Sequence, residues 1–470
     1  MDKTAKENIR KDLLRITLTA VCVRLLVFFF LSGSGFSQET ARTLYPDSVT
    51  YSAPAKAILE EGRFLNAEGA PEIYRTPGYP LFLAFCSLIF GDGWAEAAVF
   101  LQNLSNLAAV LLVYGTLLEL CGNRRAAFSG GMLACLNIHD VYFCFFILSD
   151  ILFQFLILAA AFFLIRFFKR LHSLPLILAA GLFAAGMFVR PSGLYLPVFL
   201  TAVIGGALFL RPRSALSEKQ DPGLNPGRLR RVMLPLLFLI LSMGPALLWC
   251  RRNEAVSGFS GFSAIQSANL YGYHSAGVLA FVNGTDFYQE QEHLRQNSEL
   301  SELQNRMSLQ QAETALAKQI ILTHLPVYLL LNLEGAGMIL LYPGLFDVLR
   351  LNNVFMAYLA EVRTIFLSPG SFLSRATGIL FQPFSLLVGV NFLLLLALLL
   401  WTVSGMIRSL RGGTPWYIGL TLCGIFLYFL LISAGPNGYG TYPRFRLSLS
   451  LFQAIFCGIG LTAGKRRSQE

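Results

Sequence analysis

The sequence has few charged residues and no cysteine pattern typical of a metal site. Only 14% of its 470 residues are Asp, Glu, Lys or Arg, whereas a soluble domain carries about a quarter. With 55% hydrophobic residues and a mean hydropathy of +0.58, the chain has too little polar surface to cover itself in water. These values exclude a soluble cytosolic enzyme and a disordered protein. The eight cysteines lie in or beside apolar runs without a CxxC pair, so we interpret them as small buried side chains.

The apolar residues form long blocks that alternate with basic clusters. Blocks of about 20 apolar residues are typical of membrane-spanning helices. The net charge of +10 follows from basic loops on the cytoplasmic side, as the positive-inside rule predicts. We therefore expect an all-α polytopic membrane protein and no nucleic-acid partner. A repeat of fixed period, which many transporters carry, is absent from the sequence.

The basic clusters orient the chain. The N-terminus is basic and predicted inside, and Ile16–Leu31 then crosses outward as an uncleaved first helix. The pair Arg124-Arg125 is also predicted inside. The stretch Gly78–Phe90 has 13 residues, about 20 Å of helix, which is short for a span, so we interpret it as a helix that dips into the outer leaflet. Residues 33–95 are therefore expected to form an external loop.

The remaining blocks alternate regularly, starting with Ala126–Phe146 as one outward crossing. The total is about 10 to 12 transmembrane helices, with external juxtamembrane helices and both termini inside. We expect three parts: an N-terminal catalytic module at 1–250, an external segment with an amphipathic helix at 251–322, and a C-terminal membrane module at 323–470. The pattern leaves open whether 78–90 and 325–341 cross the membrane.

Acidic residues occur at two places near the external ends of helices. Asp47 precedes a helical pattern in the first external loop, and Asp150 interrupts the apolar run FFILSDILFQFL. An aspartate flanked by Ile and Leu carries a desolvation cost, so Asp150 is a functional candidate by default. Asp47 is either a helix N-cap or a functional group. His139 and Asp140 are weaker candidates, because they are equally consistent with a helix end.

Arginines on the external side run against the positive-inside tendency, so each needs a local reason. They precede or follow helices in YRTPGYP, FVRPSG, WCRRNEAVSG and TYPRFRLSLS. Lipid headgroups are one explanation. A phosphate site built from several converging guanidinium groups is the other. The candidates are Arg75, Arg190, Arg251, Arg444 and Arg446.

Taken in order along nearly the whole chain, these motifs resemble the GT-C glycosyltransferases. An acid followed by Tyr and Gly after the first helix (Asp47, Tyr51 and Gly62), then RTPGYP, LSD at 148–150, VRPSG, WCRRN and PRFRLSLS carry the resemblance. The type is similar to family 39, the relatives of protein O-mannosyltransferases and of the lipid A aminoarabinose transferase. Two features depart from it: the first loop has a single aspartate, and PRFRLSLS lacks the usual proline.

The resemblance implies a GT-C-like bundle that moves a sugar from a polyprenyl-phosphate donor to a lipid, glycan or protein acceptor. The transfer would take place on the external face, inverting the anomeric centre. It implies a catalytic role for Asp47, with Asp150 supporting it or binding a divalent metal if one is used. The five external arginines would hold the donor phosphate, with Tyr45, Tyr51 and Tyr79 as substrate contacts. The location implied is a bacterial inner membrane, with the site facing the periplasm.

Three alternatives remain open at this point. A lipid-glycan flippase or transporter predicts charged residues along a path in mid-membrane, where the sequence offers Arg24 and Glu334. An undecaprenyl-pyrophosphate polysaccharide polymerase or ligase predicts a long, arginine-rich external loop late in the chain. A structural subunit without activity is the third alternative, because the first loop has only one acid. The sugar, the acceptor and the metal requirement are not determined by the sequence.

Overall fold

A computed structural model describes residues 3–33, 47–210, 228–304, 308–342, 344–345, 349, 383–411, 414–435 and 442–461. Tyr45 lies outside these residues. The described part of the chain is helical and contains no strand, only an isolated bridge between Leu65 and Pro71. The predicted all-α polytopic fold is confirmed.

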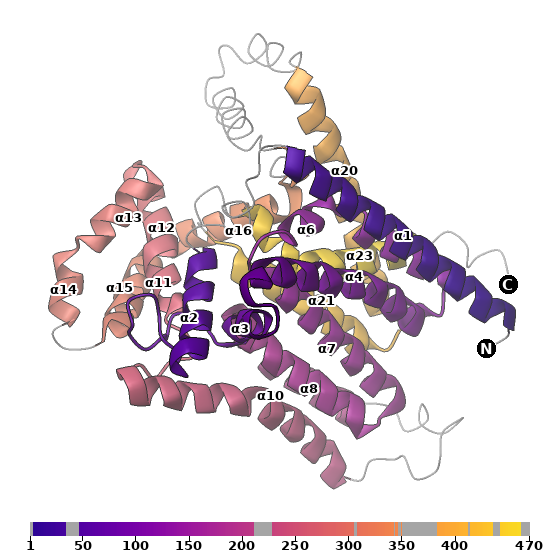
Figure 1. Ribbon diagram of the computed structural model, residues 1–470, viewed down its shortest axis with the longest axis horizontal. Coiled ribbons are helices and arrows are strands. Elements are labelled where there is room, and N and C mark those ends of the chain that lie inside the picture. The colour runs from indigo at the N-terminus through magenta and orange to yellow at the C-terminus, as the bar shows by residue number, and fades with distance from the viewer. Residues whose placement is uncertain are drawn as a thin grey trace.

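The first half of the chain forms the helices that carry most of the site (Figure 1). Their bounds are α1 Lys3–Gly33, α2 Asp47–Glu61, α3 Gly78–Phe90, α4 Trp94–Cys121, α5 Arg124–Cys135, α6 Ile138–Phe143, α7 Asp150–Arg170, α8 Ser173–Val189, α9 Leu196–Leu210 and α10 Arg228–Ser257.

The second half adds a group of short helices at 265–323 and a further set of helices. The 265–323 group comprises α11 Ile265–Asn269, the π-helix η5 Leu270–Ser275, α12 Ala276–Asn283, α13 Phe287–Arg295, α14 Ser298–Gln304 and α15 Leu309–Thr323. The further helices are α16 Leu325–Leu341, α20 Pro383–Arg411, α21 Trp416–Ser433, α22 Tyr442–Phe445 and α23 Leu447–Leu461.

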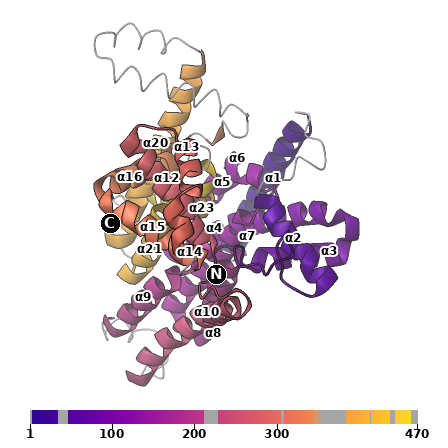
Figure 2. The same ribbon diagram turned by 90° about the vertical axis from the view of Figure 1, so that its left-hand side faces the viewer.

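Seven helical segments of the described chain are long and apolar enough to span a membrane. An eighth is possible if α15 and α16, which meet at an angle of 95°, count as one bent span. The predicted total of 10 to 12 also includes shorter apolar segments such as α8 and α23. Little of α20 is buried against other helices of the described part of the chain, and both views show one of its ends projecting beyond the other helices (Figures 1 and 2). Its apolar surface therefore suits lipid contact.

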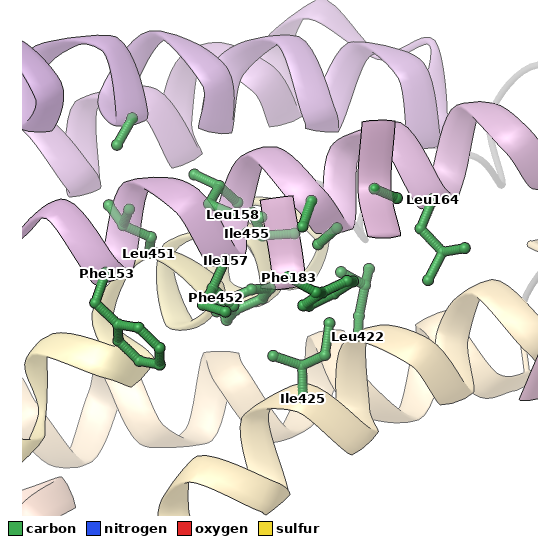
Figure 3. Close-up of a cluster of buried hydrophobic side chains, with 14 of the residues drawn as sticks. Phe153, Ile157, Leu158, Leu164, Phe183, Leu422, Ile425, Leu451, Phe452 and Ile455 are labelled. Carbon is green, nitrogen blue, oxygen red and sulfur yellow. The ribbon is translucent and has the colours of Figure 1, made fainter. Parts of the chain in front are cut away.

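The main core joins helices from both ends of the chain. Buried side chains of α7, α8, α21 and α23 interlock, with Phe153, Phe183, Ile425 and Phe452 among them (Figure 3). Helices α20 and α23 approach so closely that a Cβ at Gly405 would lie 2.0 Å from the Phe456 carbonyl oxygen. Small residues at such contacts allow helix backbones to pack in a membrane. This packing fixes α23, and with it the segment that precedes it, against α7.

The helices of the 265–323 group have a small core of their own. Its buried residues are Tyr271, Ala276, Leu294, Leu300, Ala312, Leu316 and Ala317. In Figure 1 the group lies at one end of the long axis, and the first turns of α1 lie at the other. Two hydrogen bonds join the residues just before the group to the loop before α3, from Ser263 Oγ to Tyr74 O at 2.5 Å and from Ala264 N to Ile73 O at 2.9 Å.

One predicted crossing is wrong as a single helix. The stretch Ala126–Phe146 is divided into α5 and α6, with a break at Leu136-Asn137. The break has a local reason, because Asn137 donates a side-chain hydrogen bond to Asp140 instead of continuing the helix. The short helix at 78–90, in contrast, is present with the predicted bounds.

Candidate active site

Asp47 and Asp150 are the first residues of α2 and α7. Free backbone N–H groups at a helix N-terminus favour a negative charge there. The two side chains differ in access, because 28% of Asp47 is exposed but only 1% of Asp150. Asp47 therefore forms the accessible end of the site and Asp150 its buried end.

Three arginines from three further segments converge on these carboxylates. Arg75 Nη2 lies 2.5 Å from Asp47 Oδ1, and Arg190 Nη1 pairs with Asp150 Oδ1. Arg444 bridges the two acids, since its Nη1 pairs with Asp47 Oδ2 and its Nη2 lies 2.9 Å from Asp150 Oδ2. We call these five residues the arginine–aspartate cluster. The structure thus brings together five of the residues that the sequence predicts.

Arg75 is held by the first turns of α2. Its Nε donates to Thr50 Oγ1 at 2.9 Å, and its Nη1 donates to Tyr51 Oη at 3.2 Å. The guanidinium also lies over the Tyr51 ring, 4.4 Å from the centroid. Tyr51 Oη is itself 2.9 Å from Ser149 Oγ, next to Asp150. The predicted Tyr51 is therefore part of the frame of the cluster.

Tyr79 lies behind Tyr51 and is fully buried. The two rings meet edge to face, 4.9 Å apart. Tyr79 Oη donates to Gln102, whose Nε2 donates to the carbonyl of Phe146 at 2.8 Å. This position makes Tyr79 a support for Tyr51. A substrate contact for Tyr79 remains a prediction, as it does for Tyr45 outside the described residues.

Close backbone packing holds the Arg75 and Arg190 segments together. Gly78, at the start of α3, touches the end of α8, and a Cβ there would lie 2.5 Å from the carbonyl carbon of Phe188. Only glycine allows this approach. Arg75 and Arg190 therefore face the same site although 115 residues separate them in sequence.

Glu72 and Arg252 support the cluster, and neither was predicted from the sequence. Glu72 Oε1 accepts hydrogen bonds from the backbone N–H groups of Tyr74 and Arg75, at 2.5 and 2.8 Å. Arg252 Nη1 donates to the Glu72 carbonyl at 2.6 Å and stacks 4.8 Å from the Trp249 ring centroid. The only sequence signal for Arg252 was its place beside Arg251.

Arg251 and Arg446 lie outside the arginine–aspartate cluster. Arg251 has 82% of its side chain exposed and pairs with Glu254 one turn along the same helix. Arg446 is buried and donates to the carbonyls of Ile339 and Tyr342, so it fastens the end of α16 to the start of α23. A phosphate role for either residue draws no support from this geometry.

The cluster carries three positive and two negative charges, a net charge of +1. Burial alone would raise the pKa of Asp47, but the guanidinium groups of Arg444 and Arg75 outweigh it and lower the pKa to about 2. Burial alone would lower the pKa of Arg444, but the negative charges of Asp150 and Asp47 outweigh it and raise this pKa above the ordinary value of an arginine. Asp47 and Arg444 are therefore charged at neutral pH.

The donor set does not fit a divalent metal. Each of the four carboxylate oxygens of Asp47 and Asp150 faces a guanidinium group. No group of three or more His, Cys, Asp or Glu side chains suited to a metal occurs among the residues that the structure describes. An anion is the ligand that this arrangement accommodates.

Comparison with known proteins shows what the chain resembles. A family model described as "Dolichyl-phosphate-mannose-protein mannosyltransferase" matches residues 74–218, less than half of the chain. The archaeal oligosaccharyltransferase AglB from Archaeoglobus fulgidus, solved with an inhibitory peptide and a dolichol-phosphate, superposes over 98% of this chain. Its TM-score is 0.54 at 14% identity. The chain therefore has the fold of a GT-C oligosaccharyltransferase, and part of it matches a mannosyltransferase family model.

The likeness to the GT-C oligosaccharyltransferase is one of fold. The apo form of the Archaeoglobus fulgidus enzyme matches 97% of this chain with a TM-score of 0.52 and 14% identity. The chain spans about half the length of these oligosaccharyltransferase chains, 51% and 50%. No curated protein sequence is significantly similar to it.

Proposed function

We propose that the protein is a membrane glycosyltransferase that moves a sugar from a polyprenyl-phosphate donor to an acceptor hydroxyl or amine on the external face. The observation that carries this proposal is the arginine–aspartate cluster. Its five members come from separate segments of the chain and meet at the N-termini of α2 and α7. The GT-C fold and the match to a mannosyltransferase family model support the same reaction class.

The charge of the cluster matches the proposed donor. A polyprenyl-phosphate sugar is a phosphodiester with one negative charge, which complements the net charge of +1. The planar fork of arginine suits phosphate oxygens. Because Asp47 is the exposed acid, the phosphate would replace it on Arg75 and Arg444. The buried pair of Asp150 and Arg190 would stay in place and hold Arg444.

This exchange gives Asp47 a role in catalysis. A carboxylate held by two arginines is a poor base, since its pKa is about 2. When the phosphate takes over the two guanidinium groups, Asp47 is released and its pKa rises toward that of a free aspartate. It can then accept the proton of the acceptor hydroxyl or amine.

The bond changes balance without a further reactant. The acceptor oxygen or nitrogen attacks C1 of the sugar, and the bond from C1 to the phosphate oxygen breaks on the opposite face, which inverts the anomeric centre. The electron pair leaves with the polyprenyl phosphate. Arg75 and Arg444 stabilise the charge that grows on it, and Asp47 takes the acceptor proton.

The test separates donor binding from transfer in the variant Asp47→Asn. Short-chain polyprenyl monophosphate is the binding probe, and a panel of polyprenyl-phosphate sugars is used for transfer. Asp47→Asn should bind the probe at least as tightly as the wild type, because the competing carboxylate has lost its charge. Its transfer rate should fall about a hundredfold or more, because the proton acceptor is gone.

Glu60→Gln is the matched control, since Glu60 is exposed on the same helix and pairs only weakly with Lys56 at 3.7 Å. It should leave both measurements unchanged. Normal turnover by Asp47→Asn would overturn the proposal. Binding of the probe by the wild type without transfer from any donor would favour the flippase alternative.

A further inference from the structure

Asp140 is a buried carboxylate that the proposed reaction does not use. It lies on α6 and is 1% exposed. Three side-chain donors converge on it: Asn137 Nδ2 on Oδ1 at 2.8 Å, and Gln154 Nε2 and Ser450 Oγ on Oδ2 at 2.8 and 2.6 Å. Removing a carboxylate from water is costly unless its oxygens are well bonded. The presence of a carboxylate at this buried position therefore needs a structural or functional explanation.

The hydrogen bonds of Asp140 join α7, which begins at Asp150, to α23, which begins three residues after Arg444. Gln154 lies one turn after Asp150 on α7, and its Nε2 is also 2.8 Å from the carbonyl oxygen of Leu447. Leu447 begins α23, three residues after Arg444. Ser450, the other donor to Asp140, belongs to the first turn of α23. One carboxylate therefore fixes the start of α23 against the start of α7.

Gln154 is held on its other side as well. Its Oε1 lies 3.4 Å from Asn106 Nδ2, and Asn106 Oδ1 accepts a hydrogen bond from Arg24 Nη2 at 2.6 Å. The amide of Gln154 is thus set with its oxygen toward α4 and its nitrogen toward α23. Arg24, an arginine within the first membrane helix, takes part in this chain of contacts.

We propose that Asp140 is a positioning residue that, through Gln154 and Ser450, places Arg444 between Asp150 and Asp47. The inference rests on the proposed function only in that it gives Arg444 a donor phosphate to hold. A carboxylate suits the task because both of its oxygens accept and neither donates. An asparagine of the same shape has one oxygen, so its NH2 group would face a donor from Asn137, Gln154 or Ser450.

Thermal unfolding tests the placement without any substrate. The variants are Asp140→Asn, Arg444→Gln and their combination, each in purified full-length protein. If Asp140 acts through Arg444, the loss of Tm in the double variant should be smaller than the sum of the two single losses. Ser242→Ala is the control, since Ser242 is fully buried but bonds only to its own helix α10. Its loss should add to that of Arg444→Gln.

Binding of short-chain polyprenyl monophosphate provides the second readout. Asp140→Asn should bind with full stoichiometry but on the order of tenfold more weakly, as expected when a binding group is displaced. Partly unfolded protein would instead lose stoichiometry at unchanged affinity. If Asp140→Asn does not fold, Ser450→Ala removes one donor and should show the same change in smaller measure.

The outcomes separate this inference from the proposed function. Additive losses of Tm together with wild-type affinity in Asp140→Asn, or in Ser450→Ala if that variant replaces it, would overturn the positioning role. If the wild type itself does not bind the probe, the proposed function fails. The non-additive Tm would then still establish that Asp140 acts on Arg444.

Discussion

Arg444 contacts both aspartates of the cluster, and this sharing determines how the site responds to charge. Its Nη2 group contacts the buried acid, Asp150, and its Nη1 group contacts the exposed acid, Asp47. Replacing the exposed acid by a phosphate leaves the buried contact unchanged, so the arginine does not have to move to bind. A preorganised cation of this kind costs little reorganisation during the reaction.

The low pKa of Asp47 leads to a prediction about pH. In the free protein burial raises this pKa and Arg444 and Arg75 lower it more strongly, to about 2, so Asp47 stays ionised as the pH falls. With donor bound, the phosphate cancels the field of the arginines and the pKa rises, so Asp47 is protonated at a higher pH. We expect the acid limb of kcat to lie about one pH unit or more above that of kcat/KM.

Steady-state rates of transfer at pH 2 to 8, with the wild type and Glu60→Gln, measure both limbs. The range includes the pKa of about 2 that Asp47 has in the free protein and the ordinary pKa of an aspartate, about 3.9. Coincident limbs for kcat and kcat/KM would show that Asp47 is not released when the donor binds.

At the residue level, motif position predicted most of the cluster but not the choice between neighbours. Asp47, Arg75, Asp150, Arg190 and Arg444 were all selected from their places at helix ends, and the structure brings them together. The sequence did not distinguish Arg444 from Arg446. The two side chains point in different directions because α22 ends between them and a turn follows, and the motif does not show this change of direction. Arg251 was selected in place of Arg252. Adjacent side chains on a helix point about 100° apart, and the sequence does not show which of the two faces the site.

Among the elements, the end of α10 helps to place Arg75 although it lies outside the cluster. Arg252 donates to the carbonyls of Glu72 and Phe64, at 2.6 and 3.2 Å, and Glu72 in turn caps the backbone of Arg75. Burial raises the pKa of Glu72, while hydrogen bonds from Arg75 and Tyr74 lower it less. The loop before α3 therefore depends on a helix that begins more than 150 residues later.

Exchanging Arg252 for alanine tests this dependence. Arg252→Ala should weaken binding of short-chain polyprenyl monophosphate about tenfold, because Arg75 loses its support although no ligand contact is removed. Arg251→Ala is the matched comparison. It removes the same charge from the neighbouring residue, whose side chain is exposed. Equal losses in the two variants would point to a general charge effect at this helix end.

Helix bounds were predictable where length and composition alone decide them. The short helix α3 has the predicted bounds, because an apolar run of 13 residues between prolines and glycine leaves little choice. The break between α5 and α6 was not predictable from hydropathy, which reads the stretch as one block. It depends on the local hydrogen bond from Asn137 to Asp140, and on bonds from Gln154 and Ser450 to Asp140 that form only when α7 and α23 are in place.

For the whole molecule, the distribution of charge gives an orientation. Basic residues gather at the segments predicted inside, and the external segments are acidic apart from the arginines of the site. We propose on this basis that the cluster faces the exterior, which is the periplasm if the membrane is a bacterial inner membrane. The external helices α11 to α15 would then lie on the same side.

Cysteine labelling in intact cells tests the orientation. Glu292 is exposed on α13, and Arg125 is exposed at the start of α5. In a background that carries Cys22→Ser, which removes an exposed thiol, Glu292→Cys should react with a membrane-impermeant maleimide and Arg125→Cys only after permeabilisation. The reverse pattern would invert the proposed topology.

The bridge from Asp47 to Arg444 spans 397 positions of the chain. No nascent chain can complete the cluster until residue 444 has left the ribosome and α23 has inserted beside α7. Until then, Asp47 and Asp150 lack the cation that they share. The cluster therefore stays incomplete for most of synthesis, and one of the last segments of the chain to be made supplies its shared cation.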